Sequence, residues 1–135
     1  MKILQNLKGL LLFLLLTNFV SCTDKDDSNS LIGTWSWVST DGGLAFHIHD
    51  TPVSTGKNID LQITSNGQYF IYTNGIITSK GTYIFSTQKS IVDGTNKKSI
   101  IFSVGGEMMI DKIDNLNLEL SQNAFDGIGS SYIRK

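Results

Sequence analysis

The sequence has few of the residues that cross-link or interrupt small proteins. It holds one cysteine and one proline among 135 residues, and a single cysteine excludes both an intramolecular disulfide framework and a cysteine cluster for zinc or iron–sulfur. Eleven basic residues stand against twelve acidic residues, without a basic block, a balance that argues against a surface for nucleic-acid phosphates. We therefore expect a fold held together by side-chain packing, and no nucleic-acid partner.

Motifs of the common catalytic and cofactor sites are also lacking. The chain has no Gly-x-Ser-x-Gly elbow and no glycine-rich phosphate loop before a helix. Serine, histidine and aspartate side chains are present. Their presence alone does not indicate a catalytic site, because any chain of this composition could bring such residues together in space. We predict that the protein is not an enzyme and takes no cofactor.

Two histidines are the weak candidates for a metal site. His47 and His49 flank Ile48, and in a strand residues two apart point to one face, where both imidazoles could reach one ion. An ordinary half-buried strand gives the same pattern, with Ile48 inside and both imidazoles in solvent. Because the sequence holds no third histidine, we predict no metal centre.

The first residues have the pattern of a secretory signal. Lys2 and Lys8 supply positive charge, and an apolar run begins at Gly9. A small residue, Ser21, follows that run. Even extended to Val20, the run is shorter than the roughly 20 apolar residues that span a bilayer. The pattern therefore predicts an export signal over residues 1–21 rather than a permanent transmembrane helix.

The single cysteine lies where that signal ends. Val20-Ser21-Cys22 resembles the lipobox of bacterial lipoproteins, although Phe19 stands where that pattern usually carries leucine. The resemblance implies cleavage before Cys22 and lipidation of its sulfur, with membrane attachment through the acyl chains. The alternative is a buried core cysteine in an uncleaved chain. That alternative does not explain why the cysteine lies where the signal ends.

After the cysteine, residues 23–30 contain no apolar side chain, so we expect residues 22–30 to be the lipidated cysteine and a flexible polar tether. The Lys-Asp-Asp stretch at 25–27 resembles the export signal that carries Bacteroidetes lipoproteins to the outer face of the outer membrane. A plain hydrophilic linker is the open alternative. We expect a lipid-anchored protein of the bacterial outer membrane, with its domain facing either the cell surface or the periplasm.

Residues 31–135 carry strand signals and no long stretch with helical spacing. Asn66-Gly67 and Asn74-Gly75 are typical of tight hairpin turns, and a closed sheet would leave no exposed edges. The pattern predicts an all-β domain, a single small antiparallel meander β-barrel of about eight strands, with a polar rim loop over 50–58. The expected strands cover 33–39, 59–63, 68–72, 81–85, 99–104, 108–113, 116–121 and 130–134, and 44–49 is a further short candidate.

A family resemblance rests on the start of this domain. Gly33-Thr34-Trp35 opens the first expected strand, and a rhythm of strands and Asn-Gly turns follows. Over residues 31–135 the chain resembles the lipocalin-like domains of Bacteroidetes lipoproteins, in which the motif tryptophan plugs the closed end of the barrel and a basic residue of the last strand lies across it. The resemblance implies these structural roles for Trp35 and Arg134, with Gly33 as a small neighbour of the plug.

Two functional hypotheses follow from the resemblance and the aromatic residues. In the first, a hollow lipocalin-like barrel binds a small hydrophobic ligand, as apolar walls with a few hydroxyls would allow. In the second, the barrel is filled, and its outer face or loops dock to an envelope protein or a polysaccharide. The candidate residues for lining a ligand cavity are Trp37, Tyr69, Tyr72, Tyr83, Phe85 and Phe102.

Overall fold

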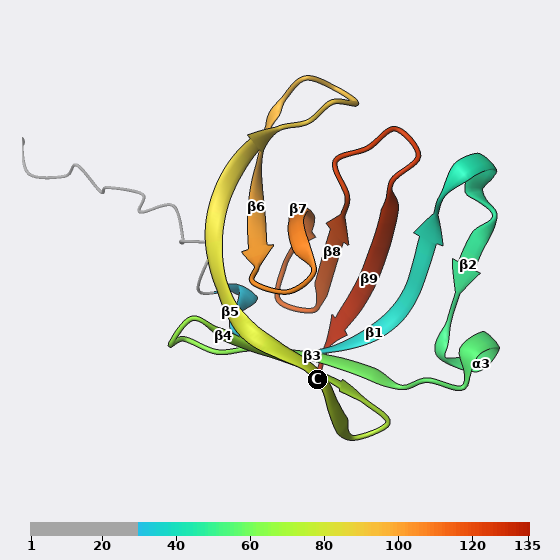
Figure 1. Cartoon of the computed structure of the whole chain (residues 1–135), viewed down its shortest axis with the longest axis vertical. Helices are drawn as coiled ribbons and strands as arrows, with labels where there is room; N and C mark the ends of the chain where they lie inside the picture. Colours follow the sequence, from blue (N-terminus) through green and yellow to red (C-terminus); the bar gives the residue numbers. More distant parts are fainter. Residues whose placement is uncertain (1–29) are drawn as a thin grey trace, which may run out of the picture.

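A computed structural model describes residues 30–135. The predicted signal over 1–21, the lipidation site Cys22 and nearly all of the tether lie outside the described residues. Within them, the chain forms an antiparallel sheet that closes on itself, with one extra strand attached to it (Figure 1). The prediction of a single all-β meander barrel of about eight strands is confirmed.

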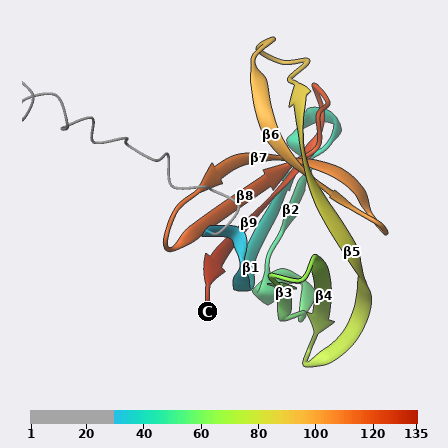
Figure 2. The same ribbon diagram turned by 90° about the vertical axis from the view of Figure 1, so that its left-hand side faces the viewer.

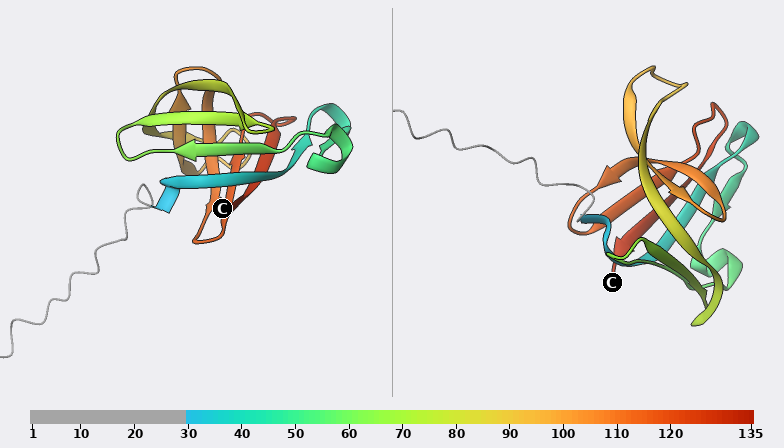
Figure 3. Two further views of the ribbon diagram at one scale, coloured as in Figure 1. Left: turned by 90° about the horizontal axis from the view of Figure 1, so that it is seen from below. Right: turned by 60° about the vertical axis from the view of Figure 1, so that its left-hand side comes forward.

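Pairing of neighbouring strands follows the chain order β1-β3-β4-β5-β6-β7-β8-β9, and a β1–β9 pairing closes the barrel. Figure 2 shows the long strand β5 curving along the height of the molecule, and Figure 3 shows β1, β3 and β4 side by side on one face. The strands are β1 (Gly33–Gly42), β2 (Ile48–Asp50), β3 (Ile59–Ile63), β4 (Gln68–Thr73), β5 (Ile76–Lys89), β6 (Asn96–Phe102), β7 (Gly106–Ile113), β8 (Asn117–Ser121) and β9 (Ile128–Arg134).

The segment between β1 and β3 differs from the prediction. The short candidate strand over 44–49 is mostly wrong, because Leu44–Phe46 forms the 3₁₀ turn η2 and only Ile48–Asp50 is extended, as β2 paired to the far end of β1. The expected rim loop contains the one-turn helix α3 (Pro52–Thr55). Thr51 caps this turn through Ser54, and proline in the first turn is pre-set for helical geometry.

The two Asn-Gly turns take different forms. Asn74 and Gly75 both have positive φ, 53° and 81°, as a tight two-residue hairpin requires. At Asn66-Gly67 only the glycine has positive φ, 79°, and its N–H donates to the carbonyl of Thr64. A three-residue loop with a glycine bulge needs one left-handed residue rather than two, which explains the difference.

The core is made of large side chains that meet inside the barrel. Each barrel strand contributes at least one of them, and leucine and isoleucine side chains surround a smaller number of aromatic rings. Trp35, Tyr69 and Ile100 are completely buried. The core cluster consists of Leu31, Trp35, Leu61, Ile63, Tyr69, Tyr83, Ile100, Leu118 and Leu120, with Ile71, Phe102, Met108, Ile110, Ile113 and Tyr132 packed against it.

Replacing Gly42 with alanine is expected to lower the free energy of unfolding by about 2–3 kcal/mol. A Cβ atom at Gly42 would lie 2.3 Å from the carbonyl oxygen of Gly127, and its φ is 126°, so the backbone would have to move. Gly75→Ala is the matched control, because φ there is 81° but no atom lies within 4 Å of the added Cβ. Urea unfolding should show a loss of only about 1 kcal/mol for the control; equal losses would contradict this account.

Candidate functional site

Trp35 and Arg134, the pair that the family resemblance singled out, are in direct contact. The Trp35 side chain is fully buried, and its Nε1–H donates to the carbonyl of Leu31 at 2.8 Å. The guanidinium carbon of Arg134 lies 4.1 Å from the centre of the indole ring. The indole of Trp35 therefore closes this end of the barrel beneath the guanidinium of Arg134. A cation over the face of an aromatic ring is electrostatically attracted to it.

Arg134 also joins segments that lie far apart in the chain. Its guanidinium donates to the carbonyls of Ser30, Ile32 (3.0 Å) and Asn115 (2.9 Å). A Cβ atom on Gly33 would lie 2.5 Å from Nη1 of Arg134, so glycine at this position leaves the guanidinium its place. These contacts hold the start of the domain against its last strand.

Four of the six candidate ligand-lining residues belong to the packed interior. Trp37 is buried, and its Nε1–H donates to Oγ1 of Thr40 at 2.9 Å. The hydroxyls of Tyr69 and Tyr83 donate to backbone carbonyls at 2.8 and 2.7 Å, and the ring of Phe102 packs edge-on against Tyr69 with centroids 4.8 Å apart. Their polar atoms are thus already satisfied by the protein, as buried groups require.

The other two candidates lie elsewhere. The expectation that Tyr72 lines the barrel interior is wrong, because it follows the core residue Ile71 in β4 and alternation along the strand turns its ring to the outer face. Phe85 packs edge-on against Tyr83 with ring centroids 5.4 Å apart, yet it is 41% exposed. It lies at the margin of the core rather than around an enclosed cavity.

The two histidines make separate local contacts. The Nδ1 of His47 bonds to the carbonyl of Leu44, and the Nδ1 of His49 pairs with the carboxylate of Asp41. His47 ends η2 and lies outside β2, so the strand alternation that would bring the imidazoles to one face does not apply. Residues 30–135 contain no group of three potential metal-ligating side chains.

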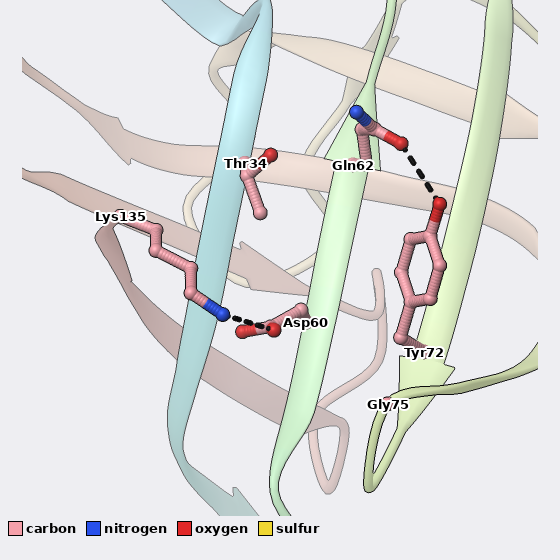
Figure 4. Close-up of a pocket in the computed structure, with 6 residues that line it drawn as sticks. All are labelled: Thr34, Asp60, Gln62, Tyr72, Gly75 and Lys135. Atoms are coloured by element: carbon pink, nitrogen blue, oxygen red, sulfur yellow. Dashed lines mark hydrogen bonds and ion pairs between the residues drawn. The ribbon is translucent and has the colours of Figure 1, made fainter.

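A hollow of about 310 Å³ lies on the outer face of β1, β3 and β4 (Figure 4). Asp60 and Gln62 project from β3 in the middle of it, with Thr34 on β1 and Tyr72 on β4 to either side. The full lining is Thr34, Asp60, Gln62, Tyr72, Gly75 and Lys135. Most of these side chains carry hydrogen-bonding groups, so the hollow is suited to a polar ligand.

Asp60 is the electrostatic centre of the hollow. Its carboxylate accepts hydrogen bonds from the ammonium of Lys135 at 2.7 Å and from the hydroxyl of Ser36 at 2.7 Å. Partial burial by itself raises the pKa of Asp60, but these two hydrogen bonds and the charge of Lys135 together hold the pKa below its ordinary value of 3.8. The carboxylate is therefore ionised at neutral pH and is a fixed acceptor.

Replacing Lys135 with methionine, which keeps an apolar stem but loses the charge, is expected to raise the pKa of Asp60. Since the folded pKa is lowered, the stability that the pair contributes is present above about pH 4 and is lost as the pH falls through the folded pKa. Carboxyl carbon NMR across an acid titration measures the pKa of Asp60 in the unchanged protein and in Lys135→Met. An unchanged Asp60 pKa in Lys135→Met would contradict the assigned pairing.

Sequence reasoning missed this hollow. Asp60 and Gln62 alternate with Ile59, Leu61 and Ile63, which is the ordinary pattern of a strand with one face in solvent. A signal was present in β4, where the run Gln68-Tyr69-Phe70-Ile71-Tyr72 is apolar on both faces. One of those faces must lie outside a barrel, so the sequence places aromatic rings beside the polar face of β3.

Comparison with known proteins finds no matching family model, no matching curated protein and no matching solved structure. Within residues 30–135, no helix has the length and apolar character needed to cross a membrane.

Proposed function

We propose that this chain is a lipid-anchored envelope protein whose lipocalin-like barrel acts as a non-catalytic binding module, with recognition on its outer surface. The observation that carries the proposal is the contrast between the two sides of the sheet. Large side chains from every barrel strand pack together inside, while the hollow of about 310 Å³, lined by carboxylate, amide and ammonium groups among others, lies outside. Inserting further atoms among packed core side chains forces them out of their preferred conformations.

The bonding of the interior polar atoms supports the same proposal. The indole N–H groups of Trp35 and Trp37 and the hydroxyls of Tyr69 and Tyr83 all donate to the protein itself. A ligand that displaced these rings would leave their buried donors unpaired, at a cost of about 1–3 kcal/mol each. A hydrophobic ligand in the barrel is therefore the less favoured form of the binding-module hypothesis.

Titration with a brominated fatty acid, followed by tryptophan fluorescence, separates the two forms. Bromine quenches indole at contact, and both tryptophans lie inside the barrel. We expect no saturable quenching of the full chain beyond that of a free indole in the same detergent. Saturable quenching at one fatty acid per chain would contradict an outer binding surface and favour an internal hydrophobic ligand.

Replacing Cys22 with serine is expected to abolish lipid attachment. A serine cannot form the thioether to diacylglycerol, so attachment to the membrane through acyl chains is lost. Metabolic labelling with radioactive palmitate measures the effect: the label should be lost. Retention of label in Cys22→Ser would contradict the assigned lipidation site.

A further inference from the structure

We propose that the outer hollow binds a neutral sugar unit of a saccharide chain, an inference that rests on the proposed outer-surface function. The observations that carry it are the register of three paired strands, the neutral ion pair at the centre of the hollow, and the ring of Tyr72 on its β4 side. Each of these observations restricts the chemistry of the ligand.

Register places the relevant side chains in two parallel rows. Thr34 pairs with Gln62, and Gln62 with Phe70; one step along, Ser36 pairs with Asp60, and Asp60 with Tyr72. Both rows lie on the outer face, since the intervening residues Trp35, Leu61 and Ile71 belong to the core. The face thus runs from small hydroxyls on β1, through planar carboxylate and amide groups on β3, to aromatic rings on β4.

The charges in the hollow favour a neutral ligand with several hydroxyls. Lys135 and Asp60 neutralise each other at 2.7 Å, so a phosphate or carboxylate ligand would have to compete with Asp60 for the ammonium. A sugar hydroxyl can donate to the carboxylate and accept from the ammonium while the pair stays intact, and hydrogen bonds to charged groups are the stronger class. The amide of Gln62 adds a donor and an acceptor.

The aromatic side of the hollow provides a surface for the C–H groups of a sugar ring. The Tyr72 hydroxyl donates to Oε1 of Gln62 at 3.1 Å, and its ring lies 6.5 Å from the ring of Phe70 with an interplanar angle of 35°. The face of an aromatic ring is electron-rich and attracts weakly positive C–H groups. Held by its hydroxyl, Tyr72 is oriented before the ligand arrives, which lowers the entropic cost of binding.

Other ligand classes fit this face less well. An extended peptide that adds a strand needs a free sheet edge, whereas β1, β3 and β4 are each paired on both sides at this place. A nucleic acid needs several unpaired cations, and the described lining offers one lysine, which is already paired. An apolar ligand would bury Asp60 and Lys135 without compensation.

Electrophoresis of the full chain, in detergent, through native gels that contain a soluble neutral polysaccharide tests the proposal. The polysaccharides are laminarin, xyloglucan, galactomannan and pullulan, each compared with a gel that contains none. We expect at least one of them to retard the chain. Asp60→Asn and Gln62→Ala should weaken that interaction at least tenfold, and Tyr72→Phe, which keeps the ring but releases Gln62, should weaken it by a smaller factor.

Asp111→Asn is the matched control. Asp111 on β7 also pairs with a lysine, Lys97 on β6, at 3.1 Å, and its side chain is 28% exposed against 27% for Asp60. This substitution should leave retardation unchanged, and far-UV circular dichroism should show that every variant is folded. Equal weakening by Asp60→Asn and Asp111→Asn would overturn the assignment of the site.

Retardation by none of the four polysaccharides would overturn the saccharide inference. That result is distinguishable from failure of the proposed function, which the brominated fatty acid reports separately. Exclusion of the fatty acid from the tryptophans would then leave an outer-surface module without a saccharide ligand. Saturable quenching would remove the outer-surface function and the inference together.

Discussion

Replacing Trp35 with alanine is expected to lower the free energy of unfolding by about 3–5 kcal/mol. The ring is completely buried, so its removal leaves a cavity among neighbours that are held by the closed sheet. It also leaves the carbonyl of Leu31 without its donor and Arg134 without the surface beneath it. Urea unfolding followed by far-UV circular dichroism measures the loss.

Small domains are stable by only about 5–15 kcal/mol, so the loss expected for Trp35→Ala is a large part of the total stability. A milder variant is therefore needed for comparison. Trp35→Phe keeps most of the packing but loses the N–H donor, and an unsatisfied buried carbonyl costs about 1–3 kcal/mol. Phe46→Ala is the control: Phe46 is 83% exposed, so the change should stay within about 0.5 kcal/mol. A Trp35→Ala loss no larger than this control would contradict the role of the ring as the plug.

Replacing Arg134 with alanine is expected to lower the free energy of unfolding by about 3 kcal/mol. The loss combines the contact with the Trp35 ring, about 0.5–2 kcal/mol, with hydrogen bonds from a charged donor, about 1.5–3 kcal/mol before non-additivity is considered. Amides of residues 30–32 should also exchange with solvent faster, since the carbonyls of Ser30 and Ile32 lose their donor. Urea unfolding and hydrogen exchange measure the two effects.

Arg134→Lys distinguishes geometry from charge. Lysine keeps the positive charge but lacks the planar fork that bonds in several directions at once. The guanidinium of Arg134 bonds to carbonyls on both sides, those of Ile32 and Asn115, and an ammonium on a lysine stem cannot reproduce that arrangement. We expect lysine to recover less than half of the loss; full recovery would show that charge alone matters.

Much of the fold could be predicted because the barrel depends on local signals. Alternation in 59–63 placed Leu61 and Ile63 inside, and the Asn74-Gly75 turn fixed the hairpin between β4 and β5. The contact between Trp35 and Arg134 was expected from the family resemblance, since the two residues are 99 positions apart in the sequence. No local pattern would have joined them.

The outer hollow could not be predicted in the same way, because it depends on the register of three strands. Asp60, Ser36 and Tyr72 come together only when β3 pairs with both β1 and β4 in one particular alignment. The position of Tyr72 was mistaken for the same reason: aromatic residues favour burial on average, and β4 carries rings on both of its faces. Deciding which face lies inside required the closed sheet.

The two tryptophan indole N–H signals in a ¹H–¹⁵N NMR spectrum report whether a hydrophobic ligand enters the barrel, which recognition outside a filled barrel would exclude. The Nε1–H of Trp35 bonds to Leu31 and that of Trp37 to Thr40, so a ligand that contacts either indole inside the barrel is expected to shift its signal. During titration of the full chain with palmitate, we expect both signals to stay in place to the end point. A saturable shift or loss of either signal at one palmitate per chain would contradict this expectation.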